Sequence, residues 1–324
     1  MFDVITIGSA IRDVFLPLGD INDYHKNFEL LAHADLGNKI NLKSVYFATG
    51  GGGTNTAFTF KNLGFRTAVF TVIGDDESGK EILKELRRNG INTDLVKRIK
   101  KGKTAYSVII LSPQGERTAF VFRGVSDFKA VTYKSFKART AKWFYLASLG
   151  GNFNLLKEFF IYAQQRKINI LWNPGGLELA LGLKKLRGFL KKTQILLVNK
   201  EEAQKLLKKS TDNLKELVQK LQAISGNLVV VTDGKNGAGA GDGKFYYQIP
   251  TIPVKVVNAT GAGDAFGSGF LASMIKSVDI ETALKIGIIN STSVIQKMGA
   301  KNGIINKWPN KEQLSAVAVK KMLL

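Results

Sequence analysis

Short apolar runs alternate with amphipathic segments along most of the chain. The first run, "DVITIGSAI", turns at a glycine and predicts a buried strand near the start of the chain. Later runs, "WFYLAS", "INILWNP", "QILLVN" and "NLVVVTDG", are separated by segments that predict helices near 153–167, 177–191 and 200–224. Continuous apolar strands that alternate with helices are typical of a parallel sheet covered on both faces. We therefore predict a three-layer α/β/α fold with a mostly parallel sheet.

Two stretches interrupt this alternation. A polar interval follows the first strand to about residue 40, and "TAYSVIILSPQGERTAFVFRG" predicts a hairpin that turns at "SPQG". These interruptions favour a small separate β lid. The chain from Val256 onward is predicted to be helical with little strand character.

Composition places the chain among ordinary globular proteins. It has 324 residues, of which 44% are hydrophobic, and no apolar run is long enough to span a bilayer. The start "MFDVITIGSA" lacks the basic and then apolar pattern of a signal peptide, so we expect a cytoplasmic protein. The absence of cysteine excludes disulfides and thiolate metal sites.

The formal charge of +21 is the largest departure from average composition. Such a charge is compatible with phosphate neutralisation on a nucleic acid. However, basic runs such as "KRIKKGK" and "LKKLRGFLKK" are scattered along the chain, and aromatic residues do not alternate with them as in a single-strand binding surface. We therefore expect a lysine-rich surface, with some steering of anionic substrates, in preference to a nucleic-acid site.

Several glycine-rich loops in the chain could bind phosphate, and the spacing of their glycines distinguishes between the known phosphate-binding patterns. No G-x-G-x-x-G occurs, and "GDDESGKE" resembles a P-loop but has Glu81 where a Ser or Thr must hold magnesium. The two histidines, His25 and His33, have no neighbouring metal ligands in the sequence. In "NATGAGD", by contrast, glycines at the start of a helix can present backbone N–H groups to an anion. Asp264 follows this loop and is placed to accept the proton of an attacking hydroxyl, so the segment indicates phosphoryl transfer.

Six motifs in the same order resemble the ribokinase-like, or PfkB, family of ATP-dependent sugar and nucleoside kinases. They are "GSAIRD" (8–13), "GGGGTNTAFTFKNLG" (50–64), "GDDESG" (74–79), "VNKEE" (198–202), "VTDGKNG" (231–237) and "NATGAGD" (258–264). The resemblance covers nearly the whole chain. It implies one ribokinase-like domain over 1–324, a lid built from segments of about 14–45 and 95–125, and ATP with Mg²⁺ as cofactors.

The resemblance also implies a role for each matched residue. Asp264 would be the base, and the backbone N–H groups of Gly261, Ala262 and Gly263 would form the anion hole. Asp13 would bind acceptor hydroxyls, in a pocket closed by Gly51, Gly52 and Asn55. Glu202, with Asn199, would order magnesium and its water ligands, and Thr232, Gly234 and Gly237 would line the nucleotide.

Two positions depart from the family pattern, Asn258 and Ala259, and the second of them stands where the signature has threonine. Asn258 replaces the first aspartate of the signature, which in many relatives helps bind an activating monovalent cation such as K⁺. A neutral asparagine holds K⁺ less firmly, so the resemblance does not carry cation dependence over to this chain.

Several alternatives remain open from the sequence. Asp13 could cap a helix or a turn, and Asn199 with Glu202 could form a capping box. The acceptor could be a nucleoside, against which lid aromatics such as Tyr24, Phe28, Phe120 and Phe122 would pack, or a phosphorylated sugar met by Arg12 or Arg123. An inactive member that binds nucleic acid or a protein partner is a further alternative. Pairing of two chains through the lid strands is also open.

Overall fold

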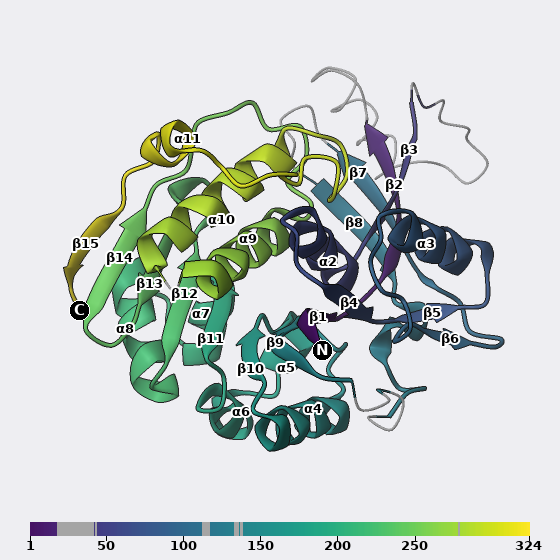
Figure 1. Ribbon diagram of the computed structural model, residues 1–324, viewed down its shortest axis with the longest axis horizontal. Coiled ribbons are helices and arrows are strands. Elements are labelled where there is room, and N and C mark those ends of the chain that lie inside the picture. Colours follow the sequence, from purple (N-terminus) through teal and green to yellow (C-terminus); the bar gives the residue numbers. More distant parts are fainter. Residues whose placement is uncertain (18–41, 43, 112–116, 133–135, 137–138, 278) are drawn as a thin grey trace.

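The computed structural model describes residues 1–17, 42, 44–111, 117–132, 136, 139–277 and 279–324. Its centre is a nine-stranded sheet (Figure 1). The strand order is β15 (Lys320–Leu323), β14 (Phe245–Ile249), β13 (Ala238–Gly241), β12 (Leu228–Thr232), β11 (Ile195–Asn199), β10 (Asn169–Trp172), β9 (Ala141–Leu146), β1 (Phe2–Ile7) and β4 (Thr67–Phe70). Neighbours from β12 to β4 pair in parallel, and the pairs from β12 to β15 are antiparallel.

Helices cover both faces of this sheet, because successive side chains of a strand point to opposite sides. On β1, Val4 packs in one apolar cluster and Ile5 in another. The cluster with Val4 includes residues of α2 (Gly52–Asn62), α9 (Ala262–Ser277) and α10 (Ile280–Ile295). The cluster with Ile5 includes residues of α4 (Phe153–Arg166), α6 (Leu183–Leu190), α7 (Lys200–Leu207) and α8 (Leu214–Ser225). The predicted three-layer fold with a mostly parallel sheet is thus confirmed.

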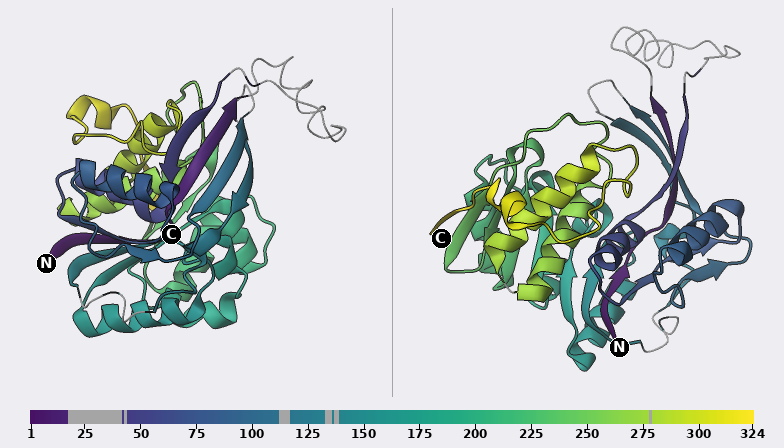
Figure 2. Two further views of the ribbon diagram at one scale, coloured as in Figure 1. Left: turned by 90° about the vertical axis from the view of Figure 1, so that its right-hand side faces the viewer. Right: turned by 45° about the horizontal axis from the view of Figure 1, so that its top comes forward.

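A separate four-stranded sheet extends beyond this body (Figure 2). Its order is β3 (Tyr46–Gly50), β2 (Ile11–Pro17), β7 (Ala105–Leu111) and β8 (Arg117–Phe122). Strands β7 and β8 form the predicted hairpin, and its "SPQG" turn lies outside the described residues. Most of the expected lid segment 14–45 also lies outside them. Within 95–125, β6 (Lys97–Ile99) pairs with β5 (Val72–Gly74) and not with the four strands.

Some local predictions differ from the structure. The helix predicted near 200–224 is two helices, because Lys208 adopts a left-handed conformation and ends α7. The helix predicted near 177–191 is divided into α5 (Gly176–Leu179) and α6 by Gly182, whose φ is 79°. Strand β15 lies in the region predicted to have little strand character. The sequence did not indicate it, because its four residues are all exposed and show no alternation of apolar and polar positions. The remaining helical elements are α3 (Glu77–Arg88), α11 (Lys311–Ser315) and two short 3₁₀ helices, η1 (Gly124–Asp127) and η3 (Gly234–Asn236). None of the helices within the described ranges is both long and apolar enough to cross a membrane.

Candidate active site

The glycine loop before α9 has a conformation that only glycine tolerates at one position. Gly261 has a φ of 82°, and a Cβ built there would lie 2.5 Å from the Cβ of Ala300. A Cβ on Gly263, by contrast, would meet nothing within 4 Å. Because α9 starts at Ala262, the first N–H groups of this 16-residue helix, which have no partner inside the helix, belong to the loop and to its first turn. The N–H of Ala262 makes a long bond of 3.4 Å to the carbonyl of Ala259. The arrangement provides a positive helix end suited to an anion.

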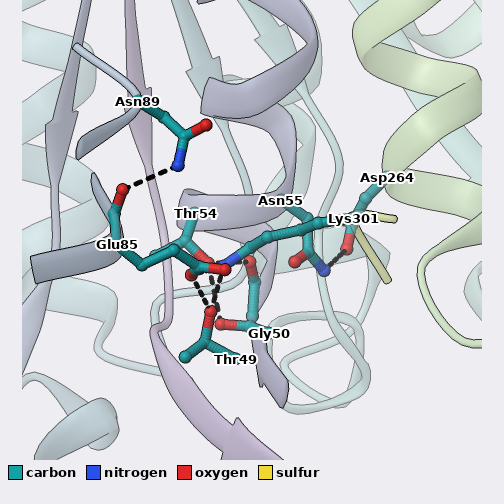
Figure 3. A network of polar contacts seen from close by, with 9 residues as sticks. Thr49, Gly50, Thr54, Asn55, Glu85, Asn89, Asp264 and Lys301 are labelled. Carbon is teal, nitrogen blue, oxygen red and sulfur yellow. Dashed lines mark hydrogen bonds and ion pairs between the residues drawn. The ribbon is translucent and has the colours of Figure 1, made fainter. Parts of the chain in front are cut away.

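Asp264, on the first turn of α9, faces helix α2. Asn55 Nδ2 donates a 2.8 Å hydrogen bond to Asp264 Oδ2, as Figure 3 shows. A Cβ on Gly52 would lie 3.4 Å from Asp264 Oδ1, so the carboxylate lies against the glycine stretch as well. Asn55 is 4% exposed, and its Oδ1 has no hydrogen-bond donor among the described residues. A buried acceptor of this kind is costly unless a bound hydroxyl supplies a donor.

The first turn of α9 is held by a buried polar network that no sequence pattern singles out. Ser268 Oγ donates to the carbonyl of Asp264 at 2.6 Å and lies 2.8 Å from the hydroxyl oxygen of Thr59. Asn290 Nδ2, on α10, donates to the carbonyl of Ala265 at 2.7 Å. These bonds fix the backbone that carries Asp264 against both α2 and α10.

Asp13 lies in the middle of β2 and is 5% exposed. It therefore caps neither a helix nor a turn, which removes the alternative reading of this residue. Ser107 Oγ, on β7, donates to Asp13 Oδ1. A Cβ on Gly50 would lie only 2.2 Å from Asp13 Oδ2, and Gly51, with a φ of 99°, leaves no room for one beside Ser9. Asp13 and Asp264 thus lie at opposite ends of the stretch from Gly50 to Gly52.

A cavity of about 350 Å³ lies beside the glycine loop, and its lining is largely apolar. Thr232, Gly234 and Gly237 line it, as expected for nucleotide-binding residues. Ala262 and Gly263 of the expected anion hole also line it. The sequence did not identify the rest of the lining, which comes from Lys235, from the segment 251–256, from Ala259 and Phe266, and from Ile288, Ser291, Thr292 and Ile295 of α10. Ordinary apolar residues in a loop and on a helix carry no signal that distinguishes them from core.

A second cavity, of about 230 Å³, continues from the first toward Asp264. Its lining comprises Asn173, Leu197, Val198, Asn199, Glu202, Thr232, Ala259, Gly261, Ala262, Gly263 and Asp264. The two cavities share Thr232, Ala259, Ala262 and Gly263. A long ligand in the first cavity would therefore reach the glycine loop and then the carboxylate of Asp264.

Asn199 and Glu202 form the capping box of α7. Asn199 Oδ1 accepts from the Glu202 N–H at 2.8 Å, and Glu202 Oε2 accepts from the Asn199 N–H at 2.9 Å. Burial raises the pKa of Glu202 above its ordinary value. Across the residues that the structure describes, no three His, Cys, Asp or Glu side chains gather into a metal site. One carboxylate beside a cavity nevertheless fits Mg²⁺, which often binds through one or two carboxylates and the substrate phosphates.

Asn258, the position that bears on a monovalent cation, makes one side-chain hydrogen bond within its own loop. The residue is fully buried, and its Oδ1 accepts from the Thr260 N–H at 3.0 Å. Its Nδ2 finds no acceptor within the described part of the chain. An amide nitrogen is a donor and cannot ligate a cation.

The remaining candidates lie outside these two cavities or cannot be described. Arg12 packs over the ring of Phe47, 5.4 Å from its centroid, beside a different cleft that Lys84 and Arg88 also line. Phe120 and Phe122 are 62% and 55% exposed on β8. Arg123 immediately precedes η1. Tyr24, Phe28, His25 and His33 lie outside the described residues.

Comparisons with known proteins identify relatives that align with most of the chain. Residues 3–307 match the sequence model of the pfkB family of carbohydrate kinases. An uncharacterized sugar kinase of Archaeoglobus fulgidus is 28% identical over 75% of this chain and 96% of its own length, and the ribokinase of Bacillus subtilis is 26% identical over 82% and 87%. The structure of a Burkholderia thailandensis nucleoside kinase in complex with inosine is similar with a TM-score of 0.76, at 18% identity, over 97% of this chain and 96% of that one.

Proposed function

Because the chain belongs to the pfkB family of carbohydrate kinases, we propose that it transfers the γ-phosphoryl group of ATP to a hydroxyl of a free sugar of the ribose or fructose type. The observation that carries the proposal is the position of Asp264. Its carboxylate is bonded to Asn55, lies against Gly52 and lines the cavity that runs from the glycine loop. A base for the acceptor and a cradle for the phosphoryl group thus occupy one place.

In this reaction Asp264 takes the proton of the acceptor hydroxyl, and the hydroxyl oxygen forms a bond to the γ-phosphorus as the bond to the β-phosphate oxygen breaks. Backbone N–H groups of Gly261, Ala262 and Gly263 stabilise the charge on the moving group, at the positive end of α9. Asn55 holds the carboxylate toward the glycine stretch and so orients it for the hydroxyl.

The acceptor occupies the space between Asp13 and Asp264. Asp13 accepts hydrogen bonds from sugar hydroxyls, and Ser107 fixes its orientation by donating to Oδ1. Gly51 and Gly52 let the sugar approach the backbone closely. Asn55 Oδ1 supplies one further acceptor for a hydroxyl.

ATP occupies the two joined cavities. The larger, apolar cavity receives the adenine and ribose beside Thr232, Gly234 and Gly237, and the phosphates extend toward Gly263. Magnesium neutralises phosphate charge when bound. Glu202, with Asn199, would hold the ion through water at the edge of the smaller cavity.

We propose further that residues 1–324 form one domain and that the sheet of β2, β3, β7 and β8 acts as its lid. Closure of such a lid excludes water, which competes with the sugar as an acceptor.

The outer strands of this sheet expose Tyr46, Phe47, Phe120, Val121 and Phe122. An apolar edge of this kind favours pairing of two lids in a homodimer. Light scattering of the double variant Phe120→Ser, Phe122→Ser tests this pairing, and a wild-type monomer at micromolar concentration would refute it.

A nucleoside is the alternative acceptor. The observation in its favour is the similarity to a nucleoside kinase structure solved with inosine, together with the exposed aromatic residues of β8, which could pack on a base. The shared motifs and the two cavities do not distinguish these acceptors.

The test is ADP release from ATP and Mg²⁺ with a panel of sugars, sugar phosphates and nucleosides. We expect a free sugar to give the highest kcat/KM. Preference for a nucleoside or a sugar phosphate would replace the acceptor class and leave the chemistry. No turnover with any acceptor, combined with salt-sensitive binding to DNA or RNA, would refute the kinase proposal in favour of an inactive, basic binding protein.

A further inference from the structure

A buried cluster of Lys301, Glu85 and Thr49 lies beside the proposed acceptor pocket (Figure 3). Lys301 Nζ lies 2.9 Å from Glu85 Oε2 and donates to Thr49 Oγ1, and the Thr49 hydroxyl donates to the same Glu85 oxygen. The ammonium also faces the ring of Phe58, 4.7 Å from its centroid. The side chain of Lys301 is 5% exposed. With a hydroxyl, a carboxylate and a ring around it, the ammonium is occupied by the protein itself and is not set aside for a ligand.

On one side, this cluster is connected to the glycine loop. Lys301 follows Ala300, and a Cβ on Gly261 would lie 2.5 Å from Ala300 Cβ and 2.9 Å from its Cα. The two backbones are therefore in direct contact. Close-packed contacts of this kind transmit displacements, so the position of Lys301 constrains the loop that forms the proposed anion hole.

On the other side, the cluster is connected to the acceptor pocket. Thr49 precedes Gly50 on β3, and Gly50 lies directly against the carboxylate of Asp13. Glu85 belongs to α3, and its carboxylate accepts from the Thr49 hydroxyl on the same strand. The ammonium thus links β3 and α3 to the segment 299–303, which is far from both in the sequence.

The charge of Lys301 also acts on the two carboxylates. Burial lowers the pKa of Lys301, whereas Glu85 from α3, Asp13 from β2 and Asp264 from α9 act in the opposite direction. An interaction between two charges is reciprocal, so the ammonium favours the ionised forms of Asp13 and Asp264. Asp264 also faces the neutral amide of Asn55, and it lines the smaller cavity together with the carboxylate of Glu202. The charges of Asp264 and Glu202 add to burial in raising the pKa of the Tyr145 phenol well above its ordinary value.

We propose that Lys301 is a positioning residue for phosphoryl transfer: its ammonium holds the acceptor strand and the anion-hole loop in register and favours the carboxylate form of Asp264. This inference rests on the proposed kinase function. Lys301 contacts neither of the two cavities, so it acts through Thr49, Ala300 and its charge and not by touching a substrate.

The experiment compares Lys301→Met with the wild type over a range of pH, with the acceptor that the panel identifies. We expect kcat/KM for the acceptor to fall about 100-fold, the KM for ATP to change less than about threefold, and the acid limb of the profile to move up by about one pH unit. Lys297→Met is the matched control, because Lys297 is an exposed lysine four residues earlier. It should resemble the wild type.

Two further variants separate positioning from simple stabilisation. Thr49→Val breaks the tie to β3 and keeps the ammonium, so it should raise the acceptor KM without moving the acid limb. Lys301→Met combined with Glu85→Gln removes the unpaired carboxylate, and it should keep the shifted acid limb even if thermal stability recovers. Two outcomes would overturn the inference and leave the kinase proposal intact. In the first, the wild type turns over the acceptor and the kcat/KM of Lys301→Met stays within about threefold of it. In the second, the acid limb of the double variant returns to its wild-type position. A wild type without acceptor-dependent turnover would overturn both. If Lys301→Met does not fold, an unchanged acceptor KM in Thr49→Val overturns the inference.

Discussion

Asn55 on α2 donates a 2.8 Å hydrogen bond to Asp264 on α9, across 209 positions of sequence. The bond leaves the other end of the Asn55 amide without a donor within the part of the chain that the structure describes. A carboxylate held on one side and a buried acceptor left open on the other define a place where a hydroxyl can bind and lose its proton. Substitution of Asp264 and of Asn55 therefore tests this place from both sides.

Replacing Asp264 by Asn should remove the base and keep the shape of the site. We expect kcat to fall by about 10³-fold and the affinity for ATP to change little, because the nucleotide cavity is unaltered. Coupled ADP release and calorimetric ATP binding measure the two effects. Asp212→Asn, at a side chain that is 91% exposed, is the control. Activity of Asp264→Asn within tenfold of the wild type would remove this residue from its proposed role.

Replacing Asn55 by Asp should place a second carboxylate against Asp264. Like charges at this distance favour sharing of one proton, so the acid limb of kcat/KM should move to higher pH and activity at neutral pH should fall about 10- to 100-fold. The pH profile of acceptor turnover tests this expectation. Asn62→Asp, two turns further along α2, should leave the profile in place; a shift of equal size there would show that the effect is not local.

Gly261 and Gly263 form a matched pair for testing the anion hole. Alanine at 261 meets both a positive φ and Ala300, whereas alanine at 263 meets no atom within 4 Å. We expect Gly261→Ala to lose most activity and about 1–3 kcal/mol of stability, and Gly263→Ala to keep its stability while its methyl group, which enters the space proposed for the phosphates, weakens ATP binding. Thermal unfolding should rank the variants in this order. The reverse order would contradict the described loop geometry.

Glu202 should link magnesium dependence to pH. Since burial raises its pKa, Glu202 takes up a proton at higher pH than an exposed glutamate does, and the Mg²⁺ concentration for half-maximal activity should rise as pH falls. The fold gains protons at this site relative to the unfolded chain, so the metal-free protein loses stability as pH rises through the interval between the two pKa values. Glu202→Gln should therefore be more heat-stable without metal near neutral pH and should need about tenfold more Mg²⁺. The exposed neighbour, as Glu201→Gln, should show neither effect.

Asn258 makes cation dependence a further test. Its side-chain oxygen is neutral and already accepts one hydrogen bond, so it attracts K⁺ less than the aspartate of the family pattern would, and replacing KCl by choline chloride at constant ionic strength should change kcat/KM less than about twofold. A strong response to K⁺ would show that other oxygens of this region hold the ion and would overturn the expectation.

The fold was predictable because its central strands are short, continuous apolar runs and many of the helices between them are amphipathic. The glycines of the motifs could also be predicted to matter, since Gly261 and Gly51 have φ values that glycine alone tolerates. Asn199 and Glu202 show a limit of such reasoning: the structure contains the capping box, and the same two residues line a cavity, so one pattern serves both readings.

Residues that act through distant partners were not predictable. Lys301 is one of 47 basic residues in the chain, and nothing local marks it as buried. Its partner Glu85 lies 216 positions away, and both belong to segments that read as ordinary charged surface. Ser268 and Asn290 are likewise polar residues within apolar helices, and only their shared contacts around the first turn of α9 reveal a role.

The stretch from Gly50 to Gly52 has a consequence for protein engineering. Each position is closed to a side chain, by Asp13, by the backbone of Ser9 and by Ala147 in turn. Libraries that randomise these three codons should yield almost only inactive clones, whatever substrate is selected. Changes of substrate preference are better sought at Ser107 on β7, beside Asp13, where a hydroxyl can be exchanged without displacing the main chain.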